Sequence, residues 1–194
     1  MGKAGITRFH ITDKVSSRGS WRFEWAMKYW PVANVLYRQV FAQLGMPLLP
    51  GEEDMRCSLA EFQAGYDYQL GIDVILRPLG GNECTLQEKF LGTEFNTVTV
   101  EHCQDWLTLE PGNWFKLKAQ YYFVGYDAKG SLRFDPWMLL DWPRLQRATA
   151  QGRMEWRMRS NEEDGARASF MYVPFDKVPS DVIVASSHRA YSLW

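Results

Sequence analysis

Two stretches decide the fold expected for this chain: Gly71-Ile72-Asp73-Val74-Ile75-Leu76 and Leu86-Gln87-Glu88-Lys89-Phe90-Leu91. The first is a short apolar run rich in branched side chains, which is typical of a buried strand and predicts one over residues 72–76. The second predicts a strand over residues 85–91. The PLGGN sequence at residues 78–82 is typical of a turn, so the two strands are expected to pair antiparallel as neighbours.

The polar residues of these two strands are expected to converge on one face of the sheet. Asp73 is a carboxylate within an apolar strand, where it must be paired, bind a cation or face solvent. Side chains alternate along a strand, so Gln87 and Lys89 point to one side and Glu88 points to the other. In the antiparallel pair, Asp73 can lie beside Gln87 and Lys89, which brings together an acid, an amide oxygen and an amine.

This combination suits the hydrolysis of a phosphodiester bond. Mg²⁺ prefers oxygen ligands and keeps several waters, so Asp73 and the side-chain oxygen of Gln87 are candidate metal ligands. The metal would acidify a bound water and shield the scissile phosphate. Lys89 is the candidate to orient or deprotonate that water and to stabilise the negative charge of the transition state.

Together the two stretches resemble the PD-(D/E)XK nuclease superfamily, in which an acid at the end of one strand is followed by an acid-x-Lys on the next. The resemblance covers about residues 54–126. It implies an α/β (α+β) fold with a restriction-endonuclease-like core, which is a central mixed sheet flanked by helices. It also implies cleavage of DNA that depends on Mg²⁺ (or Mn²⁺), with Asp73, Gln87 and Lys89 as the catalytic residues.

The chain departs from the superfamily pattern at Gln87, where Asp or Glu is usual. The amide oxygen can still ligate a metal, but a negative charge is lost. Glu88 could take this place only through a one-residue register slip, which would also turn the apolar face of the strand, so Gln87 is preferred. Three other acids could restore the negative charge as metal ligands. Glu61 and Asp67 lie near the preceding expected helix, where the superfamily often places an extra acid, and Glu101 lies on the next strand. For each of the three, the alternative is an ordinary surface position.

The whole chain, residues 1–194, is expected to form one domain. Its parts are an N-terminal helical extension (1–53), a core motif region (54–126) and a C-terminal part of the core that carries a basic segment (127–194). Apolar spacing predicts helices over about 21–44, with a split or kink at Pro31, over 54–68 and over 142–150. Further strands are expected over 97–101, 119–126 and 168–173.

Charge is unevenly distributed along a chain whose 22 Lys and Arg nearly balance its 23 Asp and Glu. An acidic middle lies between more basic ends, which suits a metal site flanked by surfaces that hold phosphate. One basic segment contains a single acid, Glu155, and has Trp142 and Trp156 interleaved with its arginines. These arginines are either a solvated face or nucleic-acid contacts: Arg144, Arg147, Arg153, Arg157 and Arg159.

Composition and spacing exclude several other classes of protein. Hydrophobic residues make up 46% of the chain and charged residues 23%, values that argue against wholesale disorder. The cysteines show no CxxC spacing, which favours reduced thiols over a disulfide framework or a zinc site, and a cytoplasmic location is expected. No apolar run of about 18 residues is present, so no membrane span is expected. The sequence does not determine the oligomeric state, and a homodimer is one of the alternatives.

Three hypotheses about function follow from these observations. The first is a Mg²⁺-dependent nuclease with DNA as its partner, of a size that suits a phage or mobile-element enzyme by analogy of fold. The second is a nucleic-acid-binding or assembly protein that keeps the nuclease fold without cleavage, which the Gln87 departure favours. The third is a different α/β protein in which Asp73 and Lys89 form a structural ion pair and no cation binds.

Overall fold

The computed structural model describes residues 17–50, 70–92, 95–161 and 167–187, with the side chains of the first helix described from residue 28 onward. These residues form a mixed α/β fold with strands in two sheets, which agrees with the expected α+β class. The helices are α2 (Ser17–Gln43), α5 (Asn113–Lys116) and α6 (Trp142–Ala150), with a 3-10 turn, η2 (Phe175–Lys177). The strands are β1 (Val74–Leu76), β2 (Cys84–Leu91), β3 (Thr97–Asp105), β4 (Glu110–Pro111), β5 (Tyr121–Asp127), β6 (Phe134–Asp141), β7 (Arg157–Asn161), β8 (Ala168–Pro174) and β9 (Ile183–Ser186).

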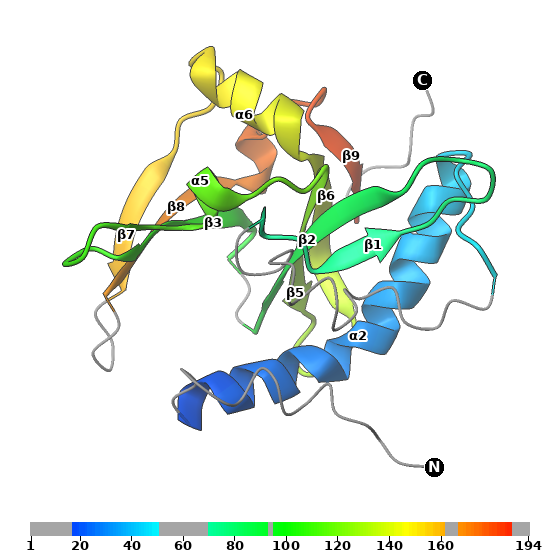
Figure 1. Cartoon of the computed structure of the whole chain (residues 1–194), viewed down its shortest axis with the longest axis horizontal. Helices are drawn as coiled ribbons and strands as arrows, with labels where there is room; N and C mark the ends of the chain where they lie inside the picture. The colour runs from blue at the N-terminus through cyan, green and yellow to red at the C-terminus, as the bar shows by residue number, and fades with distance from the viewer. Residues whose placement is uncertain (1–16, 51–69, 93–94, 162–166, 188–194) are drawn as a thin grey trace.

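The first sheet holds the two strands that carry the motif. Its strand order is β1-β2-β5-β6-β9. β1 and β2 pair antiparallel, as the sequence predicts, and Val74 stands opposite Leu86. β5 runs parallel to β2, whereas the β5–β6 and β6–β9 pairs are antiparallel, so the sheet is mixed. The helix α2 covers one face of this sheet, where Tyr37 and Phe41 are buried with Leu86 and Phe123 (Figure 1).

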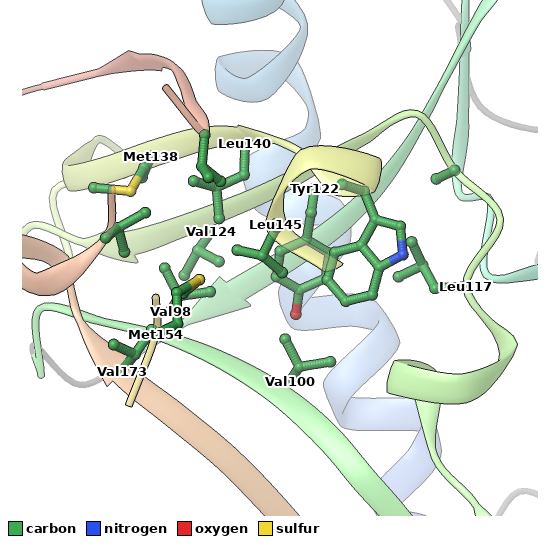
Figure 2. Packing of buried hydrophobic residues seen from close by; sticks show 14 of the residues in the cluster. Val98, Val100, Leu117, Tyr122, Val124, Met138, Leu140, Leu145, Met154 and Val173 are labelled. Atoms are coloured by element: carbon green, nitrogen blue, oxygen red, sulfur yellow. The ribbon is translucent and has the colours of Figure 1, made fainter. Parts of the chain in front are cut away.

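The second sheet has the order β4-β3-β8-β7, and all its neighbours are antiparallel. β3 and β4 belong to the connection between the parallel strands β2 and β5, whereas β7 and β8 follow α6 in the chain. A second core lies between the two sheets. Figure 2 shows Val98, Val100 and Val173 from the second sheet packed with Tyr122 and Val124 from the first.

The helix α6 begins and ends at the predicted residues. Its N-cap is Asp141, whose Oδ1 accepts a hydrogen bond from the backbone N–H of Arg144 at 2.8 Å. A proline lies in the first helical turn, where its missing N–H costs nothing. Leu145 and Ala148 face the inter-sheet core, which gives the helix the apolar stripe that the sequence shows.

The helix α2 begins at Ser17, earlier than the predicted start at about residue 21, and includes Gly19. Glycine in a helix costs only about 1 kcal/mol relative to alanine, which a helix of 27 residues absorbs. Pro31 lies inside the helix and is exposed. The helix is not split, but it changes direction along its length, as expected of a kink (Figure 1).

Four strands, β4, β6, β7 and β9, have no counterpart among the sequence predictions. β6 is buried on both faces, so its apolar residues form a run without the alternation that marks a half-buried strand. β7 is exposed for almost its whole length and has no apolar face. The helix predicted over 54–68 lies outside the described residues. Within the described part of the chain, no helix is both long and apolar enough to cross a membrane.

Candidate functional site between the two sheets

Asp73 and Gln87 are in direct contact. Asp73 directly precedes β1, and its backbone N–H donates to the carbonyl of Leu86 at 3.0 Å. Its carboxylate oxygen Oδ2 accepts a hydrogen bond from Nε2 of Gln87 and another, at 2.8 Å, from the backbone N–H of Glu88. The strand pairing that the sequence predicts therefore brings the acid and the amide of the motif together.

Gln87 is a buried polar side chain whose amide nitrogen, not its oxygen, faces Asp73. Nε2 also donates to the carbonyl of Glu88 at 3.2 Å, so two acceptors hold the amide in this orientation. The oxygen Oε1 lies on the side of Gly71, 3.0 Å from where a Cβ on that glycine would stand. The arrangement satisfies one carboxylate oxygen of Asp73 with N–H donors from Gln87 and from the backbone.

Glu88 lies on the opposite face of β2 from Asp73. Its Oε1 accepts a hydrogen bond from the hydroxyl of Tyr37 on α2 at 2.8 Å. The observed register, with Val74 opposite Leu86, is the one that places Gln87 and Lys89 on the Asp73 side. The one-residue slip that would bring Glu88 to Asp73 is therefore not the register that the chain adopts.

Lys89 connects the first sheet to the second. Its ammonium Nζ lies 5.5 Å from the centre of the Phe170 ring on β8, within the range of a cation–π contact. Phe170 is the direct cross-strand partner of Glu101 on β3. Side chains directly opposite each other on antiparallel strands share a face, so Lys89 and Glu101 both lie beside the same aromatic ring.

Tyr122 is the cross-strand neighbour of Gln87, and the sequence analysis does not single it out. It stands opposite Gln87 in the parallel β2–β5 pair, and its hydroxyl donates to the carbonyl of Thr99 on β3 at 2.7 Å. Burial raises the pKa of Tyr122 far above its ordinary value, and the charges of Asp73 and Glu101 raise it further. Two carboxylates from different sheets thus act on one neutral hydroxyl. The only signal in the sequence is the aromatic strand 121–127, whose parallel pairing local patterns do not reveal.

Two of the four acids predicted as metal ligands, Asp73 and Glu101, lie among the described residues. Among the described residues, no group of three or more His, Cys, Asp or Glu side chains is placed to hold a metal ion. Mg²⁺ commonly takes only one or two carboxylates and completes its shell with waters and substrate phosphate. The candidate ligands Glu61 and Asp67 lie outside the described residues.

The arginines of the basic segment fall into two groups. Arg144, Arg147 and Arg153 line a surface groove of about 400 Å³ together with Asp181. Arg153 pairs with Asp181 at 2.6 Å. The hydrogen bonds from Arg153 lower the pKa of the Asp181 carboxyl below its ordinary value. The second group lies on the exposed strand β7, where Arg157 is the cross-strand partner of Tyr172 and Arg159 that of Phe170. Strand register ties only this second group to Lys89 and Glu101.

The chain matches no protein-family model, and the comparisons with curated proteins and with solved structures also gave no match. Any function must therefore be inferred from the residues and their geometry.

Proposed function

We propose that the chain is a divalent-metal nuclease with a restriction-endonuclease-like core that hydrolyses phosphodiester bonds in DNA. One observation carries the proposal: Asp73 and the face of β2 that bears Gln87 and Lys89 lie together on adjacent antiparallel strands. Glu101 of the other sheet is a second acid, and its charge acts on Tyr122 as that of Asp73 does. Carboxylates and an amine are the groups that phosphodiester hydrolysis with a hard cation uses.

Each residue of the site would have its own role in the reaction. Asp73 and Glu101 would hold Mg²⁺ or Mn²⁺, and the bound ion would supply an acidified water and charge neutralisation at the phosphate. Lys89 would orient the attacking water and stabilise negative charge that develops on the phosphate oxygens. The ring of Phe170 keeps the Lys89 ammonium beside the site. Gln87 would position Asp73 through the hydrogen bond that joins them.

A second candidate function is a nucleic-acid-binding protein that keeps this architecture without cleavage. The observation that favours it is the orientation of Gln87, which donates an N–H to Asp73. A carboxylate oxygen with two N–H donors is stable without a cation. Binding without cleavage requires only phosphate contacts elsewhere on the surface.

Cleavage assays on matched variants test the proposal. Asp73→Asn keeps an oxygen acceptor for Gln87 and Glu88 but removes the charge, and Lys89→Ala removes the amine. Each should lower Mg²⁺-dependent cleavage of single-stranded and duplex DNA about 100-fold or more while DNA binding is kept. Glu88→Gln is the control, because it changes the same strand on the face away from Asp73. Equal activity in EDTA, or equal activity of wild type and Asp73→Asn, would overturn the proposal.

Gln87→Glu separates the two candidate functions. The substitution places two carboxylates in contact, so the variant should melt at a lower temperature than wild type in EDTA. Added Mg²⁺ should raise its melting temperature more than that of wild type, because the cation neutralises the pair. If wild type cleaves no DNA or RNA and Gln87→Glu gains metal-dependent cleavage, wild type belongs to the binding class. If neither cleaves and Mg²⁺ stabilises neither, Asp73 has a structural role only.

A further inference from the structure

We propose that the face of the second sheet bearing Phe170 and Tyr172 is a platform for single-stranded nucleic acid. On this platform, the two aromatic side chains stack on unpaired bases, while Arg157 and Arg159 bind phosphates. The inference deepens the proposed nuclease function, on which it rests, because it names the form of substrate that reaches Lys89 and Glu101.

The register of three strands places these side chains on one face. Arg157 of β7 stands opposite Tyr172 of β8, and Tyr172 stands opposite Thr99 of β3. These three residues form one row across the sheet. The neighbouring row consists of Arg159, Phe170 and Glu101, which stand opposite one another in the same way. Directly opposed residues of antiparallel strands share a face, so both rows cross the sheet on the same side, here called the platform face.

The other face of the same strands is buried. Val98, Val100, Met171 and Val173 alternate with the platform residues along β3 and β8, and all of them belong to the core between the sheets (Figure 2). The platform residues differ in exposure: the two arginines are exposed, and Phe170 and Tyr172 are half-buried. The rings are therefore fixed by their surroundings but retain accessible surface, as a stacking partner for a base requires.

The platform face leads from the edge of the sheet to the candidate site. β7 is the edge strand and carries the arginines, whereas β3 carries Glu101 (Figure 1). Lys89 of the first sheet lies over the ring of Phe170, in the middle of the second row. A strand of nucleic acid bound along this row would thus run from Arg159 toward Lys89 and Glu101.

The chemistry of the face fits an unpaired strand better than a duplex. Guanidinium groups bind phosphate oxygens in bidentate geometry. Aromatic side chains stack on bases of any sequence, but the faces of a base are accessible only outside the duplex stack. β7 contributes two positive charges, and neither β7 nor β8 contains an acid. Arg157 and Arg159 are thus the groups of this strand pair that can bind phosphate.

Binding in EDTA tests the platform without requiring cleavage. Fluorescence anisotropy would compare labelled oligothymidylate with a duplex of equal length, using the full chain. Wild type should prefer the single strand. Phe170→Ala and Tyr172→Leu should each weaken single-strand binding about 5-fold to 150-fold, the range for loss of one stacked base. Circular dichroism and thermal melting of each variant would confirm that it is folded.

The arginines give an independent readout through salt dependence. The double variant Arg157→Ala/Arg159→Ala should reduce the slope of log Kd against log salt by about 1.4, or 0.7 for each lost phosphate contact. Arg153→Ala is the matched control, because it removes an arginine that is paired with Asp181 outside the platform face. The control should leave the slope and the affinity unchanged.

The outcomes separate the platform from the nuclease proposal. If wild type cleaves DNA but the platform variants bind with wild-type affinity, the platform is wrong and the nuclease stands. If wild type never cleaves but the platform variants lose single-strand binding, the platform stands and the nuclease is wrong. Equal losses for duplex and single strand would make the face a general phosphate surface, which overturns the inference. Absence of any binding by wild type would also overturn it.

Discussion

Gln87 and Glu88 are neighbours in sequence with opposite environments. Gln87 faces the inter-sheet core and contacts Asp73, whereas Glu88 faces α2 and accepts a hydrogen bond from Tyr37. Tyr37 is almost fully buried at 1% exposure, so this bond stabilises the packing of α2 on the sheet. The alternation of a single strand thus assigns one polar residue to the candidate site and the next to the stability of the fold.

Tyr37→Phe tests this division. The variant loses a hydrogen bond to an ionised carboxylate, so the free energy of unfolding should fall by about 1–3 kcal/mol. Cleavage and DNA binding should stay at the wild-type level, because Glu88 lies away from Asp73. Urea denaturation followed by tryptophan fluorescence measures the first effect. A loss of cleavage without a loss of stability would show that Glu88 belongs to the site.

The pair formed by Arg153 and Asp181 gives a prediction about pH. Hydrogen bonds from Arg153 hold the pKa of the Asp181 carboxyl below its ordinary value of about 3.9. Because the folded-state pKa is lowered, the stabilisation is present above the unfolded pKa and is lost as pH falls through the folded one. Carbon-13 NMR titration of the Asp181 carboxyl should give a midpoint that rises toward the ordinary value in Arg153→Ala. An unchanged midpoint would mean that the two side chains are not paired in solution.

At the scale of single elements, α6 depends on a local signal at its first turn. Asp141 accepts the hydrogen bond from the Arg144 N–H, and a proline follows within the first turn. Asp141→Ala should lower the free energy of unfolding by about 1 kcal/mol, because an N-cap bond is lost. Asp141→Asn is the matched control, since asparagine caps as well as aspartate does. Thermal melting of both variants shows whether the hydrogen bond of the cap or the negative charge of Asp141 stabilises the helix.

Elements with local signals are the ones that the sequence predicts. The β1–β2 pair is joined by a short turn, and α6 has its cap and its apolar stripe within nine residues. The parallel β2–β5 pairing depends on contacts between residues distant in sequence, which no local pattern encodes. The same holds for the site: Asp73, Gln87 and Lys89 follow from strand alternation, whereas the role of Tyr122 follows only from that parallel pairing. The sequence does not predict β7, because an exposed edge strand needs no apolar face and so shows no alternating apolar pattern.

At the scale of the whole molecule, tyrosine hydroxyls from the first sheet hold the backbone of the second. Tyr126 donates to the carbonyl of Thr97 at 2.8 Å, and Tyr122 donates to that of Thr99 at 2.7 Å. The hydroxyl of Tyr126 also lies 3.0 Å from Oγ1 of Thr97. These bonds fix β3, and with it Glu101, relative to the sheet that carries Asp73.

Tyr126→Phe should therefore loosen the junction of the two sheets. The variant leaves the Thr97 carbonyl without this donor, so the free energy of unfolding should fall by about 1–3 kcal/mol. Hydrogen–deuterium exchange should become faster in β3 and β8 but not in β1. Tyr121→Phe is the control, because Tyr121 lies on the α2 side of β5, where its ring packs against Phe41. Slow exchange in β3 of Tyr126→Phe would show that the apolar core alone joins the sheets.

The division of the second sheet between two parts of the chain has a consequence for the timing of assembly during translation. A nascent chain can pair β1 with β2 as soon as both have left the ribosome, because the pair is local. β3 emerges soon afterwards, but β8, which pairs with it along most of its length, is made only after β5, β6 and α6. Until then one long edge of β3 stays open, and Lys89 has no Phe170 beneath it. The acids of the candidate site are thus synthesised well before the strand that completes their surroundings.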